Sequence, residues 1–75
     1  MNVEHKVQFT YPAPVRARPL LYQLSHDFDI VTNIQEARVT PDEAWLVLLI
    51  SGEERQVNQG LEWIAAQGVQ VERLS

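Results

Sequence analysis

Residues 44–50 read Ala-Trp-Leu-Val-Leu-Leu-Ile, a short apolar run that directly follows the sequence Thr40-Pro41-Asp42-Glu43. An apolar run of this length, bounded by turn residues, is typical of a buried β-strand. Proline and aspartate supply the geometry of a turn. On the other side of that turn, Ile30–Val39 is rich in β-branched residues and predicts a second strand. The two segments together predict a β-hairpin.

The N-terminal segment has the alternation of a half-buried strand. From Val3 to Tyr11, apolar or aromatic side chains and His5 occupy every second position, with polar side chains between them. Pro12 and Pro14 end this strand, because proline has no N–H to donate to a neighbouring strand.

Two helices are expected from apolar side chains at helical spacing. Arg16–Phe28 predicts the first, starting near Ala17 or Arg18, because Pro19 is tolerated in a first helical turn. Ser51 and Gly52 are expected to open the second, which runs from about Glu53 to Gln67. Gly68 is expected to end that helix, and Val69–Leu74 predicts the last strand.

The resulting order, β-α-β-β-α-β over residues 1–75, predicts one α+β domain with a ferredoxin-like fold. Right-handed crossovers then give an antiparallel sheet of strand order 4-1-3-2, with both helices on one face.

The third strand is apolar on both sides, which is unexpected when helices cover only one face of the sheet. Trp45, Val47 and Leu49 lie on one side of it. The other side carries Leu46, Leu48 and Ile50, and we assign these three residues to a dimer or partner interface. Large exposed apolar patches mark interaction sites, whereas a few exposed apolar side chains are normal on any protein.

Composition narrows the function. The net charge is −4 and the chain contains no cysteine and two histidines, His5 and His26. Nucleic-acid binding requires basic residues to neutralise phosphates, so neither nucleic acid nor an anionic membrane is an expected partner. No disulfide, metal or other cofactor is expected. No apolar run is long enough to span a bilayer, and we expect a soluble, cytoplasmic domain stabilised by oligomerisation.

The sequence offers no set of catalytic residues. Ser25, His26 and Asp27 are adjacent on a predicted helix, so their side chains diverge and cannot form a triad. Arg16 and Arg18 are either solvated or contacts for an acidic partner. We therefore do not expect an enzyme.

Several segments resemble the NIL domain family in order and spacing. They are Val7-Gln-Phe9-Thr, Pro19-Leu20-Leu21-Tyr-Gln-Leu24, Val31-Thr-Asn33-Ile34-Gln-Glu-Ala37, Leu61-Glu-Trp63-Ile64 and Gly68-Val-Gln-Val-Glu72. That family is named after an Asn-Ile-Leu signature on the second strand. Its members are known as C-terminal regulatory domains of methionine-import ABC transporter ATPases, and they also occur beside ferredoxin domains and alone.

The resemblance implies a stand-alone regulatory domain that pairs as a homodimer and binds a small amino acid such as methionine or a sulfur-containing relative. It implies ligand contacts at Asn33, Ile34 and Gln35. Asn33 suits a zwitterion because its amide both donates and accepts hydrogen bonds; otherwise it bonds to a nearby loop or marks a strand bulge. Gln35 replaces the signature leucine and Glu36 adds a charge. These departures either change which ligand the site accepts or mean that there is no site. The alternative function is a protein-interaction adaptor with no small ligand.

Two aromatic side chains fall off the apolar stripes of their helices. Tyr22 and Trp63 are either anchors for a partner, as aromatic residues often are at interfaces, or half-buried residues at the edge of an element.

Overall fold

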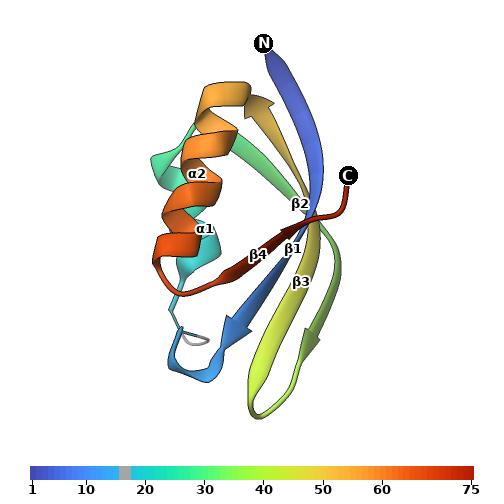
Figure 1. Ribbon diagram of the computed structural model, residues 1–75, viewed down its shortest axis with the longest axis vertical. Helices are drawn as coiled ribbons and strands as arrows, with labels where there is room; N and C mark the ends of the chain where they lie inside the picture. Colours follow the sequence, from blue (N-terminus) through green and yellow to red (C-terminus); the bar gives the residue numbers. More distant parts are fainter. Residues whose placement is uncertain (16–17) are drawn as a thin grey trace.

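The computed structural model describes residues 1–15 and 18–75 and contains the six predicted elements in the predicted order (Figure 1). The elements are β1 (Asn2–Pro12), α1 (Leu20–Asp27), β2 (Ile30–Val39), β3 (Glu43–Glu53), α2 (Glu54–Ala66) and β4 (Gln70–Arg73), with a short 3₁₀ turn at Ala13–Val15. Arg16 and Ala17, where the first helix was expected to start, lie outside the described residues. The described helix begins at Leu20, directly after Pro19.

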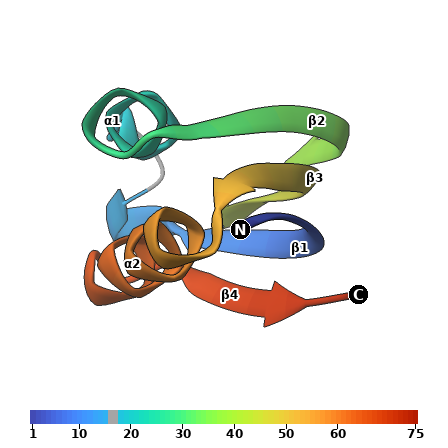
Figure 2. The same ribbon diagram turned by 90° about the horizontal axis from the view of Figure 1, so that it is seen from above.

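The four strands form one antiparallel sheet of order β2-β3-β1-β4, which is the predicted order read from the other edge. Both helices lie on one face of this sheet, so the domain has two layers (Figure 2). The ferredoxin-like α+β fold is therefore confirmed. The hairpin of β2 and β3 extends past the ends of the helices, as Figure 1 shows.

The core fills the space between the two layers. Val7 and Phe9 of β1 are fully buried, as the alternation predicted, and they lie opposite Leu48 and Leu46 of β3. The buried side chains are Val7, Phe9, Tyr11, Leu20, Leu24, Ile30, Leu48, Ile50, Val57, Leu61, Ile64 and Val69.

The assignment of Leu46, Leu48 and Ile50 to an exposed face is wrong. Cross-strand partners share a face, and these residues pair with Phe9, Val7 and His5 of β1. Leu48 and Ile50 are 0% exposed, and Leu46 packs against the core from a partly buried position. They face the helices. The helix-free face instead carries the other apolar side chains of β3, which are Trp45, Val47 and Leu49.

The junction between β3 and α2 also differs from the prediction. Ser51 and Gly52 continue β3 instead of opening the helix, because β1 and β2 extend far enough to pair with both. At Gly52 the backbone has a φ of +153°, and a Cβ there would lie 2.8 Å from the carbonyl oxygen of Asp29. Only glycine fits this close approach without strain.

The end of α2 agrees with the prediction. Gly68 has a φ of +99°, and its N–H donates to the carbonyl oxygen of Ala65. This left-handed residue ends the helix in the usual way.

The two aromatic residues outside the helical stripes have different environments. Trp63 is half-buried, and its ring centroid lies 6.0 Å from that of Phe28. Tyr22 is 69% exposed and stacks on His26 at 5.7 Å. Trp63 is therefore a half-buried residue at the edge of its helix, which was one of the two predicted alternatives. Tyr22 remains accessible to solvent.

Candidate functional site

The helix-free face of the sheet has an apolar row along its central strand β3. Trp45, Val47 and Leu49 form this row, and all three are partly exposed. Their partners on β1 are Thr10, Gln8 and Lys6, and their partners on β2 are Arg38, Glu36 and Asn33. The row is thus flanked on both sides by polar or charged side chains.

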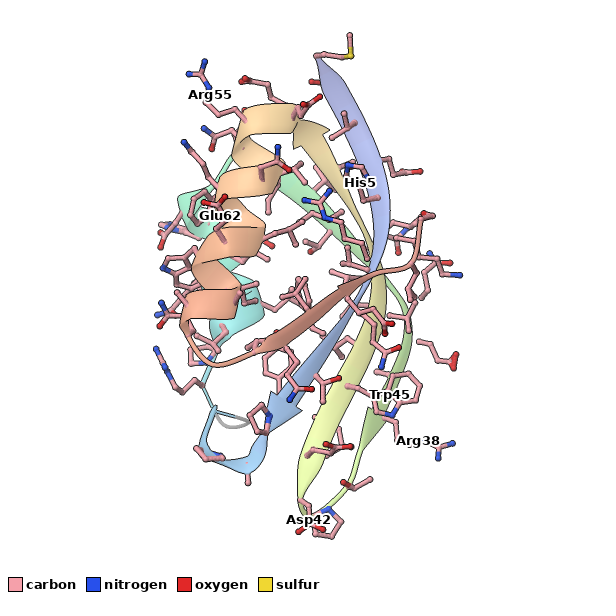
Figure 3. The ribbon with its side chains drawn as sticks, in the orientation of Figure 1. His5, Arg38, Asp42, Trp45, Arg55 and Glu62 are labelled. Atoms are coloured by element: carbon pink, nitrogen blue, oxygen red, sulfur yellow. The ribbon has the colours of Figure 1, made fainter. Side chains whose placement is uncertain are left out.

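The lower end of the row carries a cation–aromatic contact. The guanidinium carbon of Arg38 lies 5.9 Å from the centre of the Trp45 ring. Figure 3 shows both side chains on the side of the sheet that faces away from the helices. An arginine over an indole contributes about 0.5–1 kcal/mol at an exposed site, so this contact favours one orientation of the Trp45 ring at the surface.

The upper end of the row combines an amide, an alkyl group and an ammonium group. Leu49 pairs with Asn33 on one side and with Lys6 on the other. Adjacent strands are about 4.8 Å apart, so Asn33 and Lys6 stand roughly 10 Å apart across Leu49. Both are exposed, and within the described part of the chain the Asn33 side chain forms no hydrogen bond.

The three residues of the predicted ligand site do not share one face. Asn33 lies on the helix-free face, whereas Ile34 pairs with Leu48 and so faces the helix side, where it is 49% exposed. The register then steps from Ile34 with Leu48 to Glu36 with Val47, which leaves Gln35 as an extra residue in a β-bulge. One alternative predicted for Asn33 was a position in a strand bulge. The structure has the bulge at Gln35 instead.

Two other kinds of site, a metal centre and a membrane-spanning helix, were searched for among the described residues. No group of three or more histidine, cysteine, aspartate or glutamate side chains is placed to hold a metal ion there. No helix within residues 1–15 and 18–75 is long and apolar enough to cross a membrane.

The family model of the NIL domain matches residues 5–73. This match covers nearly the whole chain: β1 from His5 onward, the other three strands and both helices. The chain therefore belongs to the NIL domain family.

Solved structures have the same fold. The C-terminal domain of an ABC transporter ATP-binding protein from Enterococcus faecalis superposes with a TM-score of 0.82 at 14% identity, over 95% of this chain and 83% of that one. The de novo designed protein Foldit4 superposes with a TM-score of 0.60 at 12% identity, over 100% of this chain and 98% of that one. At these identities the likeness concerns the fold alone. No curated protein sequence matches the chain.

Proposed function

We propose that this chain is a regulatory, ligand-sensing domain that forms a homodimer and binds a small amino acid, methionine or a sulfur-containing relative, at Asn33. The observation that carries the proposal is the NIL family match over residues 5–73, which includes the whole of β2. The similarity in fold to the C-terminal domain of an ABC transporter ATP-binding protein supports the same role. The role is binding rather than catalysis, in the cytoplasm.

The chemistry around Leu49 suits an amino-acid ligand. The amide of Asn33 both donates and accepts hydrogen bonds, and the ammonium of Lys6 attracts a carboxylate. Leu49 between them offers an alkyl surface to an apolar side chain such as a thioether. Ile34 and Gln35 contribute at the edge of β2, where backbone groups are not paired with another strand.

A homodimer accounts for the apolar row. Trp45, Val47 and Leu49 are partly exposed in the monomer, and a second copy seated on this face removes them from water. A dimer would also exclude water from the ligand between Asn33 and Lys6, which strengthens polar contacts.

The second candidate function is a protein-interaction adaptor without a small ligand. It is favoured by the Arg38–Trp45 contact, since arginine and tryptophan are the side chains most enriched at the centres of interfaces. An adaptor would use the same apolar row but would be indifferent to amino acids.

A thermal-melt series separates the two functions. The purified domain is heated with each of the twenty amino acids, homocysteine and S-adenosylmethionine. A ligand at a hundredfold excess over its Kd stabilises by about 2.7 kcal/mol, which raises Tm by on the order of 10–20 °C for a domain of this size. Asn33→Ala should abolish the shift, and Gln70→Ala, an exposed amide at the other edge of the sheet, should keep it.

The absence of any shift from folded protein would reject the sensor and favour the adaptor. Sedimentation then tests the surface itself. Leu49→Lys should convert a dimer into monomers, whereas a Leu49→Lys protein that still dimerises would show that the apolar row is not the interface.

A further inference from the structure

The N-terminal part of β1 has an edge with no neighbouring strand. β4 pairs only with residues 7–10 of β1, and Leu74 and Ser75 extend this line of hydrogen bonds as far as Lys6. Beyond that point β1 rises without a neighbour on this side, as Figure 1 shows. On its other side β1 stays paired with β3 up to Asn2.

The free backbone groups of this edge belong to Asn2 and Glu4. In a strand, the N–H and C=O groups of every second residue point to the same side. Those of Lys6 point towards β4, since its C=O accepts from Leu74 at 2.7 Å and its N–H donates to Oγ of Ser75 at 3.2 Å. The N–H and C=O of Asn2 and Glu4 therefore point to this side too, and they have no partner within residues 1–15 and 18–75. Such an edge is a template for a further strand.

Helix α2 flanks the same edge. Arg73, the last residue of β4, donates to Oδ1 of Asn58 at 3.0 Å, so this side of α2 lies over the β4 side of the sheet. Glu54 lies one helical turn before Asn58. Its N–H donates to the carbonyl oxygen of Met1 at 2.8 Å, which places the first turn of α2 beside the start of β1.

Carboxylates predominate around this edge. A hollow of about 440 Å³ lies between Met1 and α2. The charged side chains that line it are those of Glu53, Glu54, Arg55 and Glu62. Figure 3 shows Arg55 pointing away from β1. On the helix-free side, Glu4 is exposed, and the basic residue of β1 on that side is Lys6. A strand added at this edge would therefore meet Glu54 on one face and Glu4 on the other.

A second copy of this chain is a poor occupant of the edge. Pairing two such edges would bring the Glu4 and Glu54 carboxylates of both copies towards one another, and like charges on paired strands are destabilising. The net charge of −4 on each copy adds to this repulsion. The charges instead favour a basic partner.

We propose that this edge accepts an extended, basic peptide segment of a partner protein as an added strand in line with β4. The peptide backbone forms hydrogen bonds with Asn2 and Glu4. Lysine or arginine side chains on its two faces pair with the carboxylates of Glu4 and Glu54. Arg73 shows the same arrangement within the chain, since it reaches α2 from the end of β4. This edge and Asn33 lie on opposite sides of β3, so the peptide does not occupy the amino-acid site proposed above.

The test is an NMR titration of the isotope-labelled domain with the peptide acetyl-Lys-Val-Lys-Val-Lys-amide. We expect the Glu4 amide signal to shift and its hydrogen exchange to slow at least about threefold at saturation, because its N–H gains a partner. No binding at millimolar peptide would overturn the proposal. Signal shifts confined to β2 would also overturn it, since the peptide would then occupy the other edge of the sheet.

Two control peptides separate strand addition from simple charge attraction. The acidic counterpart acetyl-Glu-Val-Glu-Val-Glu-amide has the same alternation and should bind at least about tenfold more weakly. The lysine peptide with methyl groups on its backbone nitrogens keeps its charge but cannot donate to the edge, and it should bind at least about fivefold more weakly. Equal affinity of either control peptide would overturn the proposal.

Matched variants of the domain locate the charge contacts. Glu4→Lys should weaken binding of the lysine peptide at least about threefold. Glu36→Lys makes the same change in net charge at an exposed position of the other edge strand and should weaken binding less. Glu54→Gln tests the contact on the helix side and should also weaken binding. Equal effects of Glu4→Lys and Glu36→Lys would show that the peptide responds to net charge alone and would reject this edge.

Discussion

The two faces of β3 should respond very differently to the same substitution, and the neighbouring residues Leu48 and Leu49 make the comparison direct. Leu48 is 0% exposed and lies between Val7 of β1 and Ile34 of β2. Leucine-to-alanine changes at such sites cost about 2–5 kcal/mol, from lost burial and the cavity left behind. A domain of 75 residues has a total stability of about 4–11 kcal/mol, so Leu48→Ala removes a large share of it.

Leu49 is partly exposed on the helix-free face, and Leu49→Ala should cost the monomer about 1 kcal/mol or less. The two variants should therefore differ by at least about 1 kcal/mol, or roughly 4–8 °C in Tm. Urea unfolding followed by tryptophan fluorescence measures both. Equal losses, or a larger loss for Leu49→Ala in dilute protein, would refute the orientation of β3 described above.

The same measurement made at two protein concentrations tests the homodimer. A dimer that buries the apolar row makes the stability of the wild type rise with concentration. Leu49→Ala should reduce that dependence, and a wild type with no dependence at all would contradict self-association through this face.

Two further predictions concern the backbone and the alkaline range. Gly52→Ala should destabilise the domain by about 2 kcal/mol or more, because it places a Cβ 2.8 Å from the Asp29 carbonyl oxygen at a φ that side chains rarely adopt. Ser51→Ala is the control. Equal stability of the two variants in urea unfolding would show that the backbones of Gly52 and Asp29 approach less closely. Tyr11 ionises near pH 10 when unfolded and at about 12 when folded. Between these values the unfolded state binds fewer protons, so stability should fall as pH rises, by up to about 1.4 kcal/mol per pH unit. Tyr11→Phe should not lose stability over this pH range. Urea unfolding at several alkaline pH values measures this, and an identical loss in Tyr11→Phe would show that another group causes it.

The order of the elements could be predicted because its signals are local. Alternation in β1, the Thr40–Glu43 turn and Gly68 each act within a few residues, and each appears in the structure where the sequence placed it. The boundary at Ser51 and Gly52 was wrong because it depends on pairing with distant strands.

The face of β3 was not predictable from its own sequence, because both of its sides are apolar. The choice is made by the register with β1, in which Val7 meets Leu48. A one-residue slip would have exchanged the two rows. The hydroxyl of Tyr11 has no hydrogen-bond partner among the described residues, and this is similarly a property of the assembled core. Alternation predicted that Tyr11 shares the side of Val7 and Phe9, but not which groups would surround its oxygen.

The bulge at Gln35 has a consequence for solubility. β2 is an edge strand, and from Asn33 to Val39 its residues are all exposed. A long, smooth edge of this kind is a template for open-ended strand addition and fibril growth. The extra residue breaks the regular spacing of its hydrogen-bonding groups, and the charges of Glu36 and Arg38 follow directly after it. We therefore expect deletion of Gln35 to restore an uninterrupted edge on β2 and to increase aggregation of the domain.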